Sequence, residues 1–123
     1  MLKKTVRIDN PSRHSTLLTQ GRVADSFWTR LRGLIGVRSL PPGGGLLIKP
    51  ANQVHTHFMA MAIDVLYVNA DNVVVDIEPA MPPWRIGRRR PAAHYVLELP
   101  SGAAARAGAA IGDRLTLSLQ QAP

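Results

Sequence analysis

The sequence predicts a strand-dominated α+β fold, in which about seven or eight short strands and two short helices form a small curled sheet or barrel. Short apolar runs bounded by turn residues recur along the chain and indicate strands. Residues 24–35 stand apart, because their apolar side chains recur at spacings of three and four. The chain has 123 residues, 46% of them hydrophobic, and shows no linker, so residues 1–123 are predicted to form a single domain.

Each predicted strand is a run of apolar or alternating residues between turn signals. In chain order these eight runs are residues 2–8, 16–18, 46–48, 54–61, 65–68, 73–77, 95–99 and 115–119. Residues 69–72, Asn-Ala-Asp-Asn, have the chemistry of a hairpin turn. Phe58 and Leu66 are expected to be buried in the core.

The longer predicted helix covers residues 24–35, with Asp25 or Ser26 as its cap. A second, Ala-rich helix is predicted over residues 101–110, capped by Ser101. Residues 79–91 contain four prolines and four arginines and are predicted to form a long surface loop.

The chain is strongly basic, with 15 Lys and Arg against 8 Asp and Glu and a net charge of +7. Most of the excess is arginine, which favours bidentate contacts to phosphate or carboxylate. Such a balance is compatible with nucleic acid, anionic lipid or a small acidic ligand as partner, and equally with solubility alone.

Several classes of protein are excluded or disfavoured. With no cysteine, the chain can form no disulfide, thiolate zinc site or iron–sulfur cluster. It contains no nucleophile elbow, His-Glu-x-x-His or Walker loop, so the sequence favours a binding role over an enzyme and predicts no cofactor. No apolar run is long enough to span a bilayer, and no signal peptide is recognisable, so we expect a cytoplasmic protein, monomeric by default.

A histidine- and methionine-rich segment is the first candidate site. If residues 54–61 form a strand, His55, His57, Met59 and Met61 share one face. Imidazoles and thioethers are soft ligands that suit copper(I), so this face is a candidate metal site. The alternatives are that these residues belong to the core and its rim, or that they line a pocket for an organic ligand.

Two acidic residues in apolar surroundings form a second candidate. Asp64 precedes a buried strand, where a fold-stabilising role bonded to backbone N–H groups is favoured over catalysis. Glu98 is expected on the polar face of its strand, near the arginine-rich loop. An enzyme that uses His55, Asp64 and Glu98 is the alternative to a binding module.

The third candidate is the arginine-rich loop. Trp84 supplies an apolar face, and Arg85, Arg88 and Arg89 supply guanidinium groups. With the nearby His55, this loop is predicted to recognise an anionic partner, either a small acidic ligand or a polyanion. Asp64 and Glu98 are included in the same candidate ligand site. The alternative is a solvated arginine run with Trp84 packed into the core.

Short blocks of the sequence, taken in order, resemble the domain of unknown function 192 family (DUF 192) over about residues 24–117. The blocks are residues 30–35, 54–56 with Met59, 63–65, 83–85, 96–102 and 112–113. The resemblance implies a compact, strand-rich and mainly prokaryotic domain, and implies no established activity or cofactor. It marks His55, Met59, Asp64, Trp84, Arg85, Glu98 and Asp113 as positions of interest.

Overall fold

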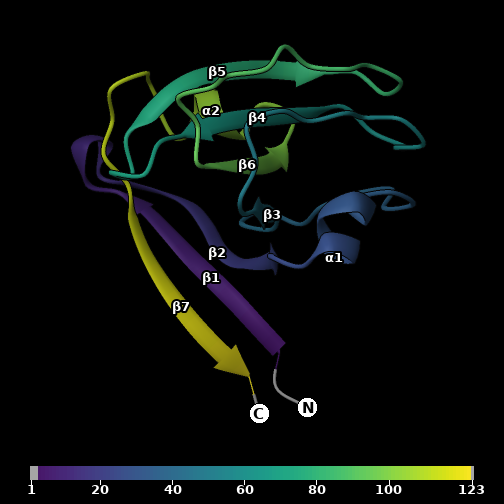
Figure 1. Cartoon of the computed structure of the whole chain (residues 1–123). Coiled ribbons are helices and arrows are strands. Elements are labelled where there is room, and N and C mark those ends of the chain that lie inside the picture. Colours follow the sequence, from purple (N-terminus) through teal and green to yellow (C-terminus); the bar gives the residue numbers. More distant parts are fainter. Residues whose placement is uncertain (1–2, 123) are drawn as a thin grey trace.

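Strands dominate the computed structural model of the protein, which describes residues 3–122 (Figure 1). One seven-stranded sheet has the order β5-β4-β6-β3-β2-β1-β7. The strands are β1 (Lys3–Asn10), β2 (Ser15–Ala24), β3 (Leu46–Ile48), β4 (Ile63–Val68), β5 (Val74–Met81), β6 (Tyr95–Pro100) and β7 (Thr116–Ala122). The helices are α1 (Phe27–Arg32), α2 (Ala103–Arg106) and a 3₁₀ turn over Pro11–Arg13. The predicted strand-dominated α+β class is confirmed.

The sheet is open and neither curls round on itself nor closes into a barrel. Its edge strands β5 and β7 do not pair with each other. The start of β5 meets the segment before β7 around an isolated bridge between Val73 and Arg114, where Val74 also donates to the carbonyl of Asp113. Beyond this point β7 runs along β1 instead. The curled sheet or barrel expected from the sequence is therefore not formed, although the fold class is as predicted.

The only parallel neighbours in the described sheet are β2 and β3, which pair from Arg22↔Leu46 to Ala24↔Ile48. A parallel pair cannot be joined by a tight turn, so the chain crosses over between the two strands. This crossover carries α1, which lies beside β3 at the end of the molecule opposite the β1–β2 turn (Figure 1).

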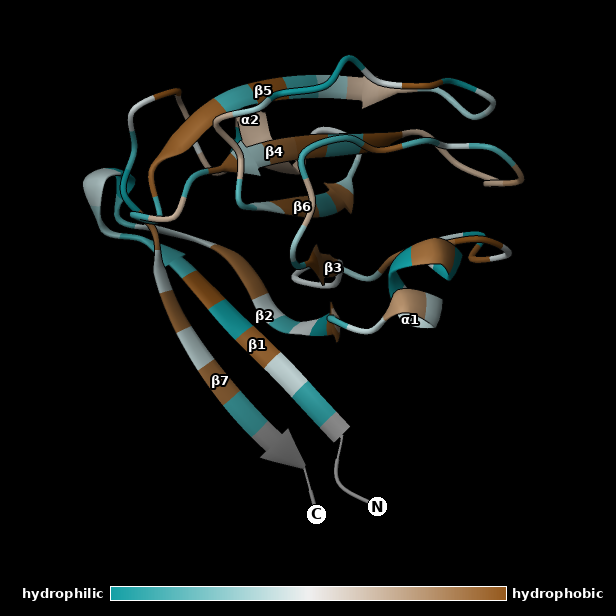
Figure 2. Ribbon diagram, in the orientation of Figure 1, coloured by the Kyte–Doolittle hydropathy of each residue, from teal (hydrophilic) through white to brown (hydrophobic). Residues whose placement is uncertain are grey.

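The central strands are apolar on both faces, as the brown segments of β3, β4 and β6 show in Figure 2. On one face Leu97 and Leu99 of β6 pack in a core that includes Ala104 of α2. On the other face Val96 packs in a second core with Leu34 and Met59. Strand β6 is thus covered twice and has no solvent-facing side. Leu66 is buried here as predicted.

The strand predicted over residues 54–61 is wrong. Within it, His55 makes a single bridge to Ile86, and the backbone turns where Met59 donates to the carbonyl of Thr56. Phe58 has a φ of +63°, in the left-handed region, and is 66% exposed, so its expected place in the core is also wrong. The alternating pattern misled because this segment bonds to another loop and not to a strand.

Both helices are shorter than predicted. Ser26 caps α1 through a capping box with Thr29, but the helix has only six residues, and Phe27 and Leu31 are exposed. Strand β5 extends to Met81, so the predicted loop over residues 79–91 begins later; Pro79 is tolerated because β5 is an edge strand. In residues 3–122 no helix is long and apolar enough to cross a membrane.

The buried carboxylate of Asp64 joins three elements. From β4, its Oδ1 accepts the N–H of Ala80 in β5 at 2.9 Å, and its Oδ2 accepts the N–H of Ala104 in α2 at 3.0 Å. The bond to Ala104 takes the place of a side-chain N-cap on α2. Gly102, the N-cap residue, has no side chain, and Ser101 does not cap the helix.

Replacing Asp64 with Asn should lower the free energy of unfolding by about 1–3 kcal/mol, because one of the two buried N–H groups would face an amide NH₂ group. Urea unfolding measures this change. The matched control is Asp71→Asn in the exposed β4–β5 turn, which should have little effect. Equal losses in the two variants would contradict the structural role of Asp64.

Candidate functional site

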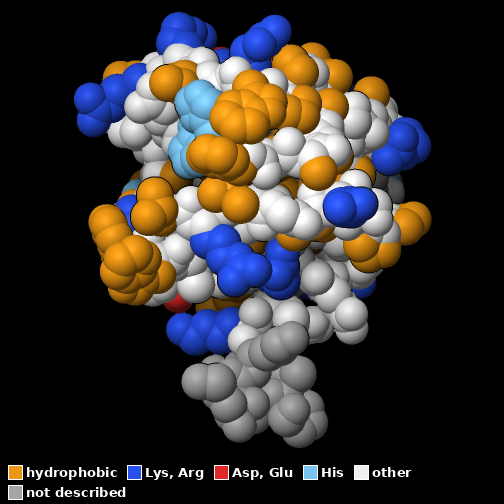
Figure 3. Space-filling view, turned by 90° about the vertical axis from the view of Figure 1, so that its right-hand side faces the viewer, with side chains coloured by type: hydrophobic (Ala, Val, Ile, Leu, Met, Phe, Trp, Pro, Cys, Tyr) orange, Lys and Arg blue, Asp and Glu red, His pale blue; other side chains and the backbone are white. Residues whose placement is uncertain are grey.

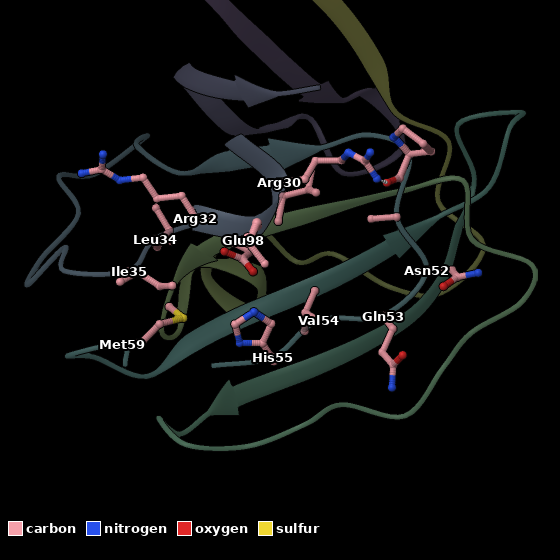
Figure 4. A pocket seen from close by; sticks show the side chains of 15 residues that line it. Arg30, Arg32, Leu34, Ile35, Asn52, Gln53, Val54, His55, Met59 and Glu98 are labelled. Atoms are coloured by element: carbon pink, nitrogen blue, oxygen red, sulfur yellow. Dashed lines mark hydrogen bonds between the residues drawn. The ribbon is translucent and has the colours of Figure 1, made fainter. Parts of the chain in front are cut away.

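A pocket of about 330 Å³ opens beside α1 (Figure 4). One wall is α1 with the turn that follows it, and the opposite wall is the segment over residues 50–59. The lining residues are Arg30, Leu31, Arg32, Gly33, Leu34, Ile35, Ile48, Pro50, Ala51, Asn52, Gln53, Val54, His55, Met59 and Glu98. Its lining mixes polar and apolar groups, and its charged side chains are Arg30, Arg32 and Glu98.

Glu98 lies in the middle of these lining residues in Figure 4. It belongs to β6 and pairs with Leu46 of β3 and Val65 of β4, so the sheet holds it from both sides. Its side chain is 2% exposed, and its Oε1 accepts no hydrogen bond from the described residues. The expectation that Glu98 points to solvent is therefore wrong, because β6 has no polar face.

Desolvation governs the chemistry of this carboxyl. Burial raises the pKa of Glu98 to about 7, since the ionised form loses its hydration in an apolar setting. A Cβ placed on Gly33, the residue that ends α1 with a φ of +51°, would lie 3.9 Å from Oε1. The end of α1 therefore covers the carboxyl without offering it a donor. Glu98 can accept a hydrogen bond when ionised or donate one when protonated.

The cations of the pocket come from α1. Arg30 donates from Nη1 to the carbonyl of Pro50 at 3.4 Å, across the mouth of the pocket. Its Nε is buried and has no acceptor among the described residues. Arg32 also lines the pocket, and in Figure 4 the guanidinium groups of Arg30 and Arg32 both extend away from Glu98, on opposite sides. The pocket thus holds a buried donor and a buried acceptor that are both unpaired, in Arg30 and Glu98.

A shallower and more apolar groove of about 600 Å³ continues from the pocket. It shares Leu31, Ile35, Gln53, Val54 and His55 with the pocket and adds His57, Phe58 and Ile86. His55 stands between the two spaces. Of the three residues in the enzyme alternative, the pocket brings together His55 and Glu98; no hydrogen bond joins them in the described structure, and Asp64 does not line it.

The candidate metal ligands are only partly gathered. The rings of His55 and His57 lie 5.4 Å apart, centre to centre. Met59 is buried in the core, and Met61 packs against the same core. The strand that would align all four is not formed, and residues 3–122 contain no cluster of three or more His, Cys, Asp or Glu able to hold a metal. The copper-type site stays a prediction from the sequence.

The arginines of the predicted loop divide into two groups. Arg90 is anchored, because its guanidinium donates to Asp76 at 2.8 Å and to the hydroxyl of Tyr67 at 2.8 Å, and lies 4.0 Å above the Tyr67 ring. The same bond to Arg90 lowers the pKa of Asp76. Arg88 also reaches Asp76, at 3.3 Å, from an exposed position. The structure shows no ion pair for Arg85 or Arg89 in the described chain.

Trp84 is exposed rather than packed into the core. Its ring lies 4.7 Å from that of Phe58 and 5.9 Å from that of His57, centre to centre. Trp84 has a φ of +64°, and Phe58 has nearly the same value. Two large aromatic residues in this backbone region are unusual, because a side chain there crowds its own carbonyl.

Thr56 holds these two aromatic residues in place and is fully buried. Its backbone N–H donates to Arg85 and its carbonyl accepts from Trp84. Its Oγ1 donates to the carbonyl of Pro82 at 2.6 Å and accepts from the N–H of Arg85 at 2.9 Å. With the bond from the N–H of Gly87 to the carbonyl of Val54, these bonds of Thr56 tie the segment over residues 54–59 to the segment over residues 82–87.

Sequence reasoning did not assign Arg30, Arg32 or Thr56 to a site. Arg30 and Arg32 form a basic pair on the predicted helix, but no sequence pattern places that helix opposite His55. Thr56 lies between His55 and His57, whose spacing predicts a metal site and not a structural threonine. Asp113, marked by the resemblance, lies outside the pocket, where it binds Asn10 and Arg13.

Comparison with known proteins places the chain in a set of similar sequences. A family model described as Uncharacterized ACR (DUF192) matches residues 9–117. A UPF0127 protein of Pyrococcus furiosus is 31% identical over 111 residues, which cover 86% of this chain and 93% of that protein. One of Pyrococcus horikoshii is 30% identical over 113 residues, covering 88% and 96%.

Solved structures share the fold. A protein of Sinorhizobium meliloti has a TM-score of 0.78 at 25% sequence identity, covering 94% of this chain and 93% of that chain. A protein of unknown function from Novosphingobium aromaticivorans has a TM-score of 0.79 at 20% identity, covering 91% and 83%. The overall fold is therefore common to these proteins.

Replacing Thr56 with Val keeps the shape of the side chain and removes its hydroxyl. The N–H of Arg85 and the carbonyl of Pro82 would lose a partner, so the free energy of unfolding should fall by about 1–3 kcal/mol. Chemical denaturation measures the loss. Thr19→Val, which removes an exposed hydroxyl on β2, is the control and should change stability little. An unchanged Thr56→Val protein would show that the two segments are held by other contacts.

Replacing Glu98 with Gln should make stability less dependent on pH. The carboxyl has a pKa of 4.5 in the unfolded chain and about 7 in the folded protein. Between these values the folded protein holds a proton that the unfolded chain has released, so wild-type stability falls as the pH rises and stays lower above pH 7. We expect similar stability near pH 4.5, and a Gln variant more stable by about 3 kcal/mol at pH 8.

Urea unfolding of both proteins at several pH values between these limits measures the difference. A difference of constant size at all pH values would contradict the burial of an ionisable carboxyl at this position.

Proposed function

We propose that this chain, which belongs to the DUF192 family, is a binding module for a small organic acid held in the pocket beside α1. The description of that family assigns no function. The ligand class is an anion that also carries a hydroxyl or amino group. The observation that carries the proposal is the buried, unpaired carboxyl of Glu98 at the centre of the pocket. Buried polar groups are nearly always hydrogen-bonded, and an exception calls for a partner.

The two unpaired groups of the pocket have complementary needs. Nε of Arg30 is a donor that lacks an acceptor, which a carboxylate or phosphate oxygen supplies. Oε1 of Glu98 is an acceptor that lacks a donor, which a hydroxyl or ammonium group supplies. A ligand that carries both groups satisfies both residues at once. A simple acid or a simple amine satisfies only one.

The charges around the pocket favour an anion. Arg30 and Arg32 are fixed cations, and Glu98 is the only acidic residue among the lining residues. With its pKa raised to about 7, Glu98 is partly neutral at physiological pH. The net charge of the lining is therefore positive, which favours an anion.

The arginine-rich loop contributes less to this site than the sequence suggested. The pocket and groove linings include Ile86, but not Trp84, Arg85, Arg88 or Arg89. We propose that the small ligand is recognised by Arg30, His55 and Glu98, while the loop serves a different, larger anionic surface.

Matched pairs of small acids test the proposal. Lactate with propionate, glycine with acetate, and glycerol phosphate with methyl phosphate differ in the presence of the donor group. Isothermal calorimetry should show binding of at least one donor-bearing member with a Kd below about 1 mM and at least tenfold weaker binding of its partner, since a pocket that leaves a buried carboxyl unpaired discriminates strongly.

Glu98→Gln and Arg30→Met should each weaken that binding by about tenfold or more. Arg38→Ala, an exposed arginine outside the pocket lining, is the control and should bind like the wild type. The proposal fails if no member of the panel binds in this range, or if the Glu98 and Arg30 variants bind as tightly as the wild type.

A further inference from the structure

We propose that the exposed hydrophobic residues around the mouth of the groove dock the protein on an anionic lipid bilayer. We call this surface the aromatic face; it consists of Phe27, Trp28, Leu31, Phe58, Trp84 and Ile86. Of these residues only Leu31 also lines the pocket, and the inference does not depend on the ligand proposed above.

The exposed apolar side chains of this protein are concentrated, not scattered. Of the eight large hydrophobic residues that the described chain leaves exposed, six belong to the aromatic face. Figure 3 shows hydrophobic side chains gathered beside the histidines on the end of the molecule that carries α1. Single exposed apolar residues need no explanation, but a contiguous group of this kind marks an interaction surface.

Three separate segments meet in this surface. Leu31 of α1, Phe58 and Ile86 line the same groove. Trp84 adjoins Phe58 at 4.7 Å between ring centres. The rings of Phe27 and Trp28 lie 5.1 Å apart and stand one helical turn before Leu31. The face is therefore continuous across α1 and two loops.

The backbone holds two of these rings outward against its own preference. Phe58 and Trp84 both have a positive φ, at +63° and +64°. Such strain persists where surrounding bonds enforce it, and it is concentrated at functional sites. Here the enforcing bonds are those of the buried Thr56. The two rings are not part of the core, because Phe58 is 66% and Trp84 is 56% exposed.

Positive charge borders the aromatic face. Arg85 and Arg89 are exposed, follow Trp84 by one and five residues, and form no ion pair in the described structure. Arg32 is exposed on α1. Asp25, which precedes α1, is paired with Lys4, and Asp76 is paired with Arg90. The whole chain carries a net charge of +7, which complements anionic headgroups.

The combination fits a bilayer interface better than nucleic acid or a protein groove. Trp prefers the headgroup level, where its ring is buried and its N–H stays hydrated. Arginines beside it contact lipid phosphates, and Phe and Leu enter the acyl boundary. A nucleic acid surface would use the arginines but would leave Phe27, Leu31 and Ile86 in water.

The protein contains its own reporters for this test. Its two tryptophans, Trp28 and Trp84, are both on the aromatic face and both exposed. When vesicles of phosphatidylcholine with phosphatidylglycerol are added, the tryptophan fluorescence should shift to shorter wavelength. Brominated lipid in the vesicles should quench this fluorescence. The variants Trp28→Phe and Trp84→Phe leave one reporter each, and both remaining signals should respond. Vesicles of phosphatidylcholine alone should bind at least tenfold more weakly.

Two double variants separate the apolar and the electrostatic contributions. Phe58→Ser with Trp84→Ser should weaken vesicle binding at least tenfold, with Trp28 as the reporter. Arg85→Ala with Arg89→Ala should weaken it by about 25-fold at low salt and less at high salt, since each arginine near an anionic surface contributes about fivefold. The control variants are Ile111→Ser and Arg114→Ala, which change an exposed apolar residue and an exposed arginine outside the aromatic face. Both control proteins should bind vesicles like the wild type.

Circular dichroism and thermal unfolding check that each variant is folded. The proposal is overturned if vesicles leave the emission of both tryptophans unchanged, or if the control variants lose binding as much as the double variants. It is also overturned if the face instead mediates self-association that competes with vesicles, or if RNA binds through Arg85 and Arg89 while vesicles do not. Retained binding of the small acid by the Phe58/Trp84 variant would show that pocket and face act independently.

Discussion

The hydrogen bonds of Thr56 are the constraint on which both candidate surfaces depend. They fasten residues 54–59 to residues 82–87, two segments that the strand pairing of the sheet does not connect directly. One side of the fastened unit supplies His55 and Met59 to the pocket, and the other side turns Phe58 and Trp84 outward. A buried hydroxyl with fully satisfied bonds suits this task, because it specifies one geometry and penalises every alternative that breaks it.

The sheet imposes the second constraint, on Glu98. A carboxyl at the edge of a sheet could turn to water, whereas β6 lies between β3 and β4 and has cores on both faces. The fold therefore keeps an ionisable group where it lowers stability at neutral pH. Natural proteins retain such departures from good packing mainly where function requires them.

The sequence predicted the strands whose apolar runs are buried on both faces, and residues 46–48 and 95–99 agree with β3 and β6 to within a residue. The prediction from the sequence failed where tertiary contacts, and not the local hydrophobic pattern, determine the backbone. Residues 54–61 alternate like a strand, yet their backbone bonds go to a loop. Glu98 resembles a solvent-facing residue in Val-Leu-Glu-Leu, and only the sheet order shows that both faces are covered. The structural role predicted for Asp64 agrees with its bonds to two backbone N–H groups, since a carboxylate before a buried strand has few other partners.

The pairing of β1 with β7 has a consequence for the connectivity of the fold. Lys3 pairs with Ala122, so the first and last described strands run side by side and their outer ends are neighbours in the sheet (Figure 1). A short linker could join these ends, and new termini could open in the exposed turn over residues 69–72, between β4 and β5. Such a circularly permuted chain would keep every strand pair and both cores. The order of the strands along the polypeptide is thus separable from the architecture that they build.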